Sequence, residues 1–193
     1  TPSDKTYLKS SPLDLFKHRI PWLALLMVSA TFTGLIITSF EEALAAQVAL
    51  TAFIPMLMDT GGNSGSQASV TVIRALSLGD IEFADIFRVL WKEIRVAVLC
   101  AVTLAVLNFA KIQLVDVMLL GHSTVTITVT AVVCITLAFT IVCAKIVGSS
   151  LPLFAKKLGF DPAVMASPFI TTIVDVLSLL VLFTLASSIL KIV

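Results

Sequence analysis

The sequence PAVMASPFITTIVDVLSLLVLFTLASSIL occupies residues 162–190 and contains a single charged side chain, Asp175. Roughly 20 consecutive apolar residues allow a helix to cross the hydrocarbon core of a bilayer. This stretch therefore predicts a transmembrane helix. Three further tracts, at residues 21–40, 96–110 and 117–144, carry no charged side chain.

Charge is scarce along the whole chain and gathers in short clusters between these tracts. Apolar residues make up 58% of the 193 positions and charged residues 13%, whereas soluble domains carry about 25% charged residues. The pattern predicts an all-α integral membrane protein, a bundle of five transmembrane helices. The expected helices lie at about residues 20–40, 46–78, 94–113, 124–147 and 163–190. The polar residues 1–19 are expected to form a cytoplasmic connecting segment ahead of a transmembrane domain at 20–193.

Local features refine these helices. The second is longer than a bilayer requires, so we expect it to be tilted, kinked or broken, and to end at the Gly-Asp pair at 79–80. Apolar residues at helical spacing over 81–94 predict an amphipathic surface helix that continues into the third span. Residues 124–130 alternate like a strand, but an isolated strand lacks partners in a bilayer, so a helix is expected. A loop with Lys156, Lys157, Gly159 and the Asp-Pro pair at 161–162 should precede the fifth span.

The distribution of Lys and Arg predicts the orientation. These residues accumulate in cytoplasmic connections, and here they gather before the first span, after the second and after the fourth. They are Lys5, Lys9, Lys17, Arg19, Arg74, Arg88, Lys92, Arg95, Lys145, Lys156 and Lys157. Lys111 and Lys191 alone fall on the other side. With five spans, the N-terminus is expected in the cytoplasm and the C-terminus outside.

Two acidic residues fall at membrane depth, Asp59 in the second span and Asp175 in the fifth. A carboxylate in hydrocarbon is costly, so a buried acid normally faces a water-filled path or a charged partner. No basic residue lies near mid-span, because Arg74 and Lys145 sit toward the cytoplasmic ends. We therefore expect Asp175 to be a functional residue that faces a water-filled path, and not a structural residue paired with a base. A purely structural membrane anchor, in which Asp175 would be dispensable, is the less favoured alternative.

The second span carries two rows of residues spaced by four positions. The polar row is Asp59, Asn63, Gln67 and Thr71, and the small row is Gly61, Gly65 and Ser69. An offset of two residues is about 200° around a helix, so the rows are expected on nearly opposite faces. The small row would let another helix approach closely, and the polar row would offer oxygen atoms. In the fifth span a polar face is expected at Thr171, Thr172, Asp175 and Ser178.

These polar faces favour a path for a hard cation. Interhelical hydrogen bonds, each worth ~1 kcal/mol, account poorly for two faces that each contain an acid without a basic partner. Mg²⁺ takes oxygen ligands and keeps several waters. His18 and His122 lie outside the spans, and the three cysteines are expected to be free thiols in apolar tracts. Without His or Cys on the polar faces, Zn²⁺ is disfavoured relative to Mg²⁺.

Three stretches resemble the MgtE-type magnesium channel family. They are PMLMDTGGNSGSQ at 55–67, IRALSLG at 73–79 and DPAVMASPFITTIVD at 161–175. The resemblance covers the whole chain, since the family's membrane domain also has five helices. It implies a homodimer in the bacterial plasma membrane, with a Mg²⁺ pore on the two-fold axis lined by helices two and five. It also implies that Asp175 of both subunits contacts hydrated Mg²⁺, with the Thr171 backbone carbonyl nearby.

The resemblance and the polar faces together predict further positions along the ion path: Asn63, Asp59, Gly62, Gly65, Gln67 and Thr172. Ser178 stands where the family leads us to expect a small Gly, and should affect packing more than the ion. Family members normally carry cytoplasmic regulatory domains, which we expect in the full-length protein, with residues 1–19 as the end of the connecting helix. The expected partners are a second copy, Mg²⁺ and the lipid bilayer, and no nucleic acid.

Other interpretations stay open at this level. An exchanger driven by Na⁺ or H⁺, or a carrier of Co²⁺ or Mn²⁺, would use the same oxygen ligands. An intramembrane aspartyl protease would pair Asp59 with Asp175 around a shared proton. Asp59 begins the Asp-Thr-Gly of aspartic proteases, but that motif belongs to an all-β fold and the Gly-x-Gly-Asp of intramembrane proteases is absent. We therefore expect a transporter and not an enzyme.

Overall fold

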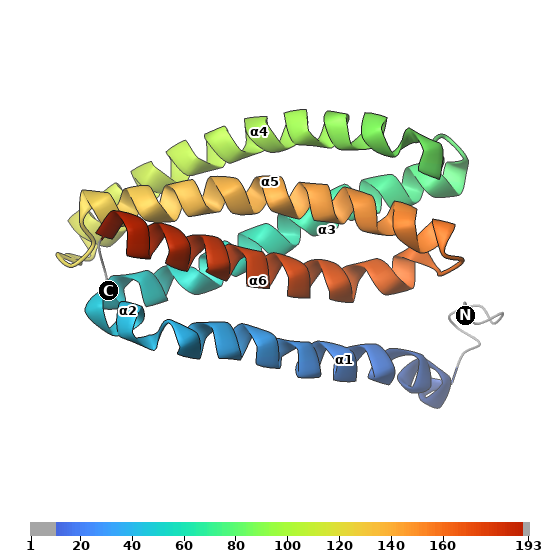
Figure 1. Ribbon diagram of the computed structural model, residues 1–193, viewed down its shortest axis with the longest axis horizontal. Helices are drawn as coiled ribbons and strands as arrows, with labels where there is room; N and C mark the ends of the chain where they lie inside the picture. The colour runs from blue at the N-terminus through green and yellow to red at the C-terminus, as the bar shows by residue number, and fades with distance from the viewer. Residues whose placement is uncertain (1–10, 191–193) are drawn as a thin grey trace.

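The computed structural model describes residues 11–190, and every regular element in that range is helical. Figure 1 shows the five long helices: α1 (Pro12–Ser39), α3 (Ile54–Leu78), α4 (Ile86–Lys111), α5 (Ile127–Lys157) and α6 (Pro162–Leu190). The short elements between them are α2 (Glu41–Ala46), the 3-10 helices η2 (Val48–Phe53) and η3 (Phe83–Asp85), and the π-helix η4 (Ile112–Leu119). The predicted all-α fold is confirmed.

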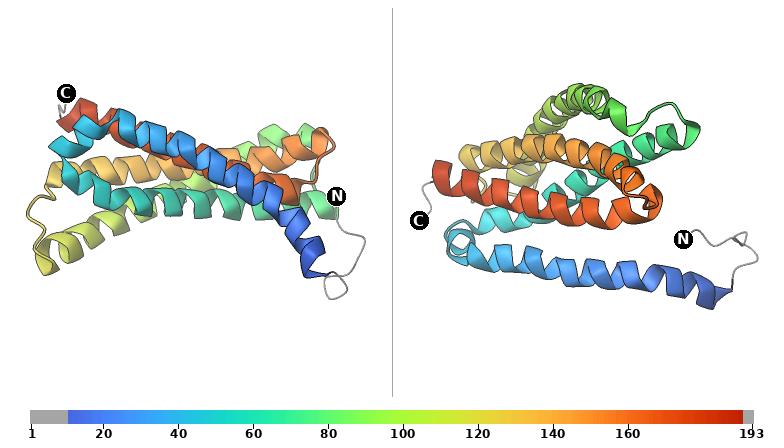
Figure 2. Two further views of the ribbon diagram at one scale, coloured as in Figure 1. Left: turned by 90° about the horizontal axis from the view of Figure 1, so that it is seen from below. Right: turned by 45° about the vertical axis from the view of Figure 1, so that its right-hand side comes forward.

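Helix α5 lies at the centre of the bundle and packs against α3, α4 and α6 (Figure 1). Helix α1 lies on the outside, where it packs against α6 (Figures 1 and 2). Helices α3 and α6 are far apart in the sequence but also pack against each other. The two helices that carry the predicted polar faces are therefore neighbours.

Four helical stretches are long and apolar enough to cross a membrane: Pro12–Ser39, Phe83–Leu119, Ile127–Lys157 and Phe169–Leu190. They correspond to the first, third, fourth and fifth predicted spans. Helix α3 is not among them, because polar side chains lower its hydropathy. Its 25 residues would nevertheless extend over about 37 Å at ~1.5 Å per residue, which is enough to cross a bilayer.

Helix α1 begins at Pro12, so the described part of the expected connecting helix and the first span, expected from about residue 20, form one continuous helix. Its start is fixed by a capping box, in which the backbone N–H of Asp14 donates to Ser11 Oγ at 3.2 Å. The backbone N–H of Ser11 donates in return to Asp14 Oδ2 at 3.3 Å. These bonds satisfy donors that have no partner inside the helix. Residues 12–19 of the predicted connecting segment are thus helical, and residues 1–10 lie outside the described part of the chain.

The long second span is not a single α-helix: its first part is the 3-10 helix η2, which runs directly into α3. Gln47 separates α2 from η2, and α3 starts only at Ile54. The helix ends at Gly79, whose φ of 76° provides a left-handed cap, as glycine does without steric cost. This end matches the Gly-Asp break expected from the sequence.

From Ile86 onward, the helix predicted over 81–94 and the third span form one continuous helix, α4, as expected, and its location at the membrane surface stays a prediction. The strand-like run at 124–130 leads into α5, where Thr126 Oγ1 accepts a hydrogen bond from the backbone N–H of Val129 at 3.2 Å. A threonine that caps a helix in this way satisfies a donor of its first turn. The prediction of a helix over this run is confirmed from Ile127 onward.

The predicted loop before α6 starts later than expected, because Lys156 and Lys157 lie in the last turn of α5 and the connection runs from Leu158 to Asp161. Tertiary contacts extend the helix to this point. Lys156 Nζ donates to the carbonyl of Leu76 at 3.0 Å. Lys157 Nζ lies 4.0 Å from the centre of the Phe83 ring. Cations near a helix C-terminus are also favoured by the helix dipole.

Candidate functional site

Helix α3 presents the two opposite faces that its sequence predicts. The small row, Gly61, Gly65 and Ser69, is buried, and the polar row, Asp59, Asn63, Gln67 and Thr71, is exposed in the single chain. A Cβ atom on Gly65 would come within 2.7 Å of Ile170 Cγ2 in α6, and one on Gly148 in α5 would overlap the Gly65 carbonyl. The small row therefore lets α3 approach both neighbouring helices closely, as predicted.

A pocket of about 260 Å³ opens where α3 faces α6. It is lined by Met58, Asp59, Gly62, Asn63, Ser66, Thr171 and Asp175. The first five come from α3 and the last two from α6. The exposed side chains of Asp59 and Asn63 form its outer edge, and the half-buried Asp175 and Thr171 lie opposite. Two helices that meet through small residues thus bring two carboxylates to one hollow.

The pocket unites five of the predicted ion-path residues: Asp59, Gly62, Asn63, Thr171 and Asp175. The remaining three lie elsewhere. Gly65 is buried in the contact with α5 and α6. Gln67 is exposed further along the polar row. Thr172 is directed to α1, where its hydroxyl hydrogen-bonds Ser29 Oγ at 2.8 Å.

Ser178 does not line the pocket, although it was expected to share a face with Asp175. It is buried, and its hydroxyl donates to the carbonyl of Val174 at 2.6 Å. Its Oγ would lie 3.5 Å from a Cβ atom on Gly61. The side chain therefore contributes to the packing of α6 against α3.

Sequence reasoning missed two lining residues, Met58 and Ser66. The helical period of 3.6 residues explains the omission. Steps of four drift around the helix by about 40° each, so the row from Asp59 leaves the pocket before it reaches Gln67. Steps of three or four from Asp59 lead to Gly62, Asn63 and Ser66, and Met58 precedes Gly62 by four, which completes the set of α3 residues that line the pocket.

The electrostatic character of the pocket is set by its two carboxylates. Within the described residues, neither Asp59 nor Asp175 has an ion pair or a hydrogen bond from another side chain. Nor do three His, Cys, Asp or Glu side chains gather anywhere in that part of the chain to form a metal cluster. One copy thus supplies two carboxylates, an amide and hydroxyl groups, which suit a hydrated hard cation better than a fully dehydrated one.

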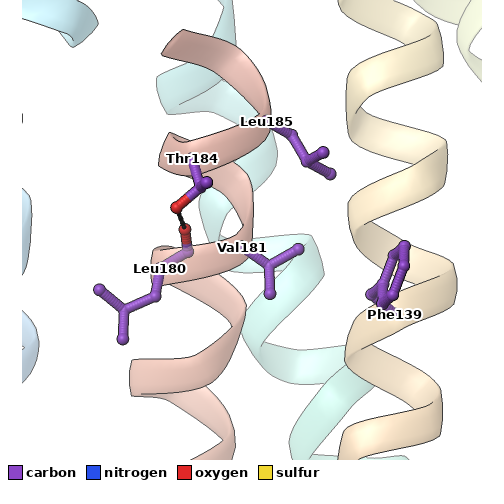
Figure 3. Close-up of a pocket in the computed structure, with 5 residues that line it drawn as sticks. All are labelled: Phe139, Leu180, Val181, Thr184 and Leu185. Atoms are coloured by element: carbon purple, nitrogen blue, oxygen red, sulfur yellow. Dashed lines mark hydrogen bonds between the residues drawn. The ribbon is translucent and has the colours of Figure 1, made fainter. Parts of the chain in front are cut away.

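A second hollow of about 250 Å³, between α5 and α6, has the opposite character. Phe139, Leu180, Val181 and Leu185 line it with Thr184, whose hydroxyl donates to the Leu180 carbonyl at 2.6 Å (Figure 3). The only hydroxyl in this hollow is therefore satisfied within α6. Its walls offer nothing to an ion and suit contact with lipid chains.

Comparison with known proteins identifies similar sequences. A family model described as "MgtE: Divalent cation transporter" matches residues 54–185. The chain is 34% identical over 188 residues to a magnesium transporter MgtE of Thermus thermophilus, covering 97% of this chain and 40% of that protein. The corresponding protein of Bacillus subtilis is 34% identical over 171 residues, covering 89% of this chain and 36% of that protein.

A third relative, the magnesium transporter MgtE of Enterococcus faecalis, is 30% identical over 184 residues, covering 95% of this chain and 39% of that protein. The chain therefore spans about two fifths of the length of the curated relatives it matches. The matched residues 54–185 include every residue that lines the pocket between α3 and α6.

Proposed function

The chain belongs to the MgtE family of divalent cation transporters, and from this premise we propose that it conducts Mg²⁺ across the membrane through a pore at the axis of a homodimer. The family is one of transporters, which favours transport over the protease alternative. The three relatives are named magnesium transporters, and this chain matches 36–40% of the length of each. The greater length of these relatives supports the presence of regulatory domains elsewhere in the full-length protein.

The observation that carries the proposal is the meeting of Asp59 and Asp175 in one pocket inside an apolar bundle. A charged residue at the centre of a bilayer costs about 2.5–3.5 kcal/mol on insertion scales. In the described residues neither acid is paired with a base. Two unpaired carboxylates at one site repel each other. A passing divalent cation offsets both this repulsion and the cost of placing the charges in the bilayer.

The exposed polar row of α3 supports a second copy. Asp59, Asn63 and Gln67 are exposed in the single chain, although they belong to a helix long enough to cross the bilayer. Lipid cannot satisfy their polar groups. A two-fold axis beside α3 and α6 would cover this row and double each carboxylate. The ion path would then lie between the copies.

The proposed roles follow from the chemistry of Mg²⁺, which keeps several waters and is bound through one or two carboxylates. Asp175 of each copy would contact the hydrated ion, and the backbone carbonyl of Thr171, one turn earlier, would accept hydrogen bonds from its waters. Asp59 and Asn63 would line the path toward this point. Gly62 would keep the hollow open, because no side chain extends from it.

The orientation is also part of the proposal. The start of α1, the α3–α4 connection and the end of α5 lie at one end of the bundle (Figure 1). That end carries most of the described basic residues: Lys17, Arg19, Arg74, Arg88, Lys92, Arg95, Lys156 and Lys157. Lys111 lies toward the other end. Because basic residues mark the cytoplasmic side, we place the first end in the cytoplasm of a cell whose plasma membrane holds the protein.

Flux of Mg²⁺ into proteoliposomes tests the proposal. Wild-type protein should admit Mg²⁺, and Asp175→Asn, which removes one charge with little change in shape, should abolish the flux. Asp80→Asn provides a matched control, because Asp80 is exposed in the turn after α3 and its loss changes the charge equally. Mn²⁺ and Ca²⁺ as competitors would define selectivity among divalent ions.

The outcomes separate the alternatives. Flux that persists in Asp175→Asn would overturn the ion path at this residue. Flux that requires an opposing Na⁺ or H⁺ gradient would replace the channel by an exchanger that uses the same pocket. Equal loss in Asp80→Asn would assign the effect to overall charge instead of to the pocket.

A further inference from the structure

Helix α4 carries three basic residues on one exposed face, away from the pocket. Arg88, Lys92 and Arg95 are spaced by four and three positions, so they fall within about 60° of one another around the helix. Trp91 lies at the edge of the same face with 62% of its surface exposed. The side chain of Arg88 is 89% exposed. We refer to these four residues as the basic face.

The positive charge of the basic face is only slightly offset. Asp85 contacts Arg88 at 3.4 Å, an exposed pair of the kind that contributes little. Arg95 lies 5.9 Å from the centre of the Trp91 ring. Within the described residues, no carboxylate comes within ion-pair distance of Lys92 or Arg95. At least two cations are thus available to an external anion.

The same face of α4 becomes apolar directly beyond Arg95. Leu99, Val102 and Val106 are 71%, 60% and 63% exposed. From Arg95 to Val106 the helix rises by about 16 Å, roughly half the thickness of the hydrocarbon core. The face therefore combines cations and an aromatic ring at one end with an apolar strip of acyl-chain length.

We infer that this face of α4 binds an anionic phospholipid, with the headgroup phosphate between Lys92 and Arg95 and an acyl chain along Leu99, Val102 and Val106. Arg and Lys suit phosphate, and a tryptophan ring is favoured at the interface between headgroups and chains. A second copy of the chain is a poorer occupant, because α5 lies between α4 and α6 (Figure 1) and α6 contributes to the proposed dimer face. The inference requires only that α4 crosses the membrane.

Fluorescence of Trp91 provides a direct test with the full chain in vesicles. The sequence contains two tryptophans, so Trp22→Phe leaves Trp91 as the only one. Phosphatidylglycerol or phosphatidylcholine with brominated chains is then titrated into vesicles of unlabelled phosphatidylcholine, and quenching of Trp91 reports the lipid beside it. Juxtamembrane basic residues attract anionic lipids. We therefore expect brominated phosphatidylglycerol to reach half-maximal quenching at a roughly tenfold lower membrane fraction than brominated phosphatidylcholine.

Two triple variants in the same background separate a site from general charge attraction. Arg88→Gln with Lys92→Gln and Arg95→Gln should reduce the preference to within about twofold. The second triple variant combines Lys17→Gln, Arg19→Gln and Arg74→Gln. It removes the same number of exposed charges and should keep the preference for phosphatidylglycerol. The single variant Lys92→Gln, with helicity checked by circular dichroism, serves if the first triple variant does not fold, and should lower the preference severalfold.

Several results would overturn the inference. Equal quenching by both lipids in the parent would show no preference. Equal loss in the two triple variants would indicate net charge and no site. Displacement of the brominated lipid by millimolar inorganic phosphate would show that the face binds the free anion and not the lipid. None of these readouts depends on Mg²⁺ flux, so they leave the proposed function untouched.

Discussion

Gly65 in α3 and Gly148 in α5 touch through their backbones, and a Cβ atom on Gly148 would overlap the Gly65 carbonyl. The contact sets how close α3 lies to α5 and fixes the rotation of α3 about its axis. The small row is thereby turned inward, and Asp59 and Asn63 are turned toward the pocket. The position of the ion path thus depends on two residues that have no side chain.

Replacing Gly148 by alanine should destabilise the bundle by about 1–3 kcal/mol, because the new methyl group meets backbone that cannot rotate away. Gly34→Ala is the matched control, since no atom lies within 4 Å of a Cβ at that position in α1. Alanine there should be neutral or slightly stabilising, as alanine is in helices. Thermal unfolding in detergent, followed by circular dichroism, measures both. Equal unfolding temperatures for Gly148→Ala and wild type would contradict the close contact.

Gly62 and Gly61 should respond differently to alanine, although they are adjacent. A Cβ atom on Gly62 would lie 3.8 Å from Thr171 Cγ2, an ordinary contact, whereas one on Gly61 would lie 2.6 Å from Thr140 Cγ2. Gly62→Ala should fold normally and reduce Mg²⁺ flux severalfold, because its methyl group enters the pocket. Gly61→Ala should mainly lower the unfolding temperature. An unstable Gly62→Ala, or one with wild-type flux, would remove Gly62 from the ion path.

The two carboxylates should not be equivalent. Asp175 is half-buried and Asp59 is exposed in the single chain, so the field of Asp175 is less screened and should act more strongly on the ion. Asp59→Ala is therefore expected to weaken ion binding and flux by less than Asp175→Ala. Flux in proteoliposomes over a range of Mg²⁺ concentrations compares the two. An equal or larger loss in Asp59→Ala would reverse the ranking.

Much of this architecture could be predicted from the sequence, because a bilayer imposes strict demands on length and polarity. Uncharged tracts located four of the five helices, and the alternation of glycine and polar residues identified both faces of α3. The expected connecting helix and the first span merge into α1, whose start at Pro12 is set by a local cap of Ser11 and Asp14 ahead of the apolar tract. The end of α5 was missed because its last turn is stabilised by contacts with Leu76 and Phe83.

The candidate site was predicted less completely than the fold. Asp59 and Asp175 could be singled out by their charge alone, since unpaired acids are rare at membrane depth. Ser66 and Met58 could not, because neither is unusual in a membrane helix and the four-residue step left them out. Helical spacing alone also misplaced Thr172. It precedes Asp175 by three residues and was therefore expected on the same face, yet its hydroxyl hydrogen-bonds Ser29 of α1. No pattern within α6 reveals this partner.

That hydrogen bond, 2.8 Å between Ser29 Oγ and Thr172 Oγ1, should attach α1 to α6 instead of serving transport. Thr172→Val keeps the shape of the side chain and removes the hydroxyl, and Ser29→Ala removes its partner. A double-mutant cycle on unfolding should give a coupling of about 0.5–1 kcal/mol, with flux close to wild type in all three variants. Loss of flux in Thr172→Val at unchanged stability would instead place Thr172 on the ion path, as the sequence had predicted.

The proposed homodimer predicts which positions can be cross-linked between copies. In a chain whose free cysteines, Cys100, Cys134 and Cys143, are replaced by alanine, Asn63→Cys should form a covalent dimer with a short bifunctional thiol reagent. Leu99→Cys is the control, because Leu99 is 71% exposed on α4, away from the proposed axis. Electrophoresis after treatment in the membrane separates dimer from monomer. If Asn63→Cys reacts with a monofunctional maleimide but stays monomeric, the polar row of α3 does not face its counterpart, and the pore would have to lie within a single copy.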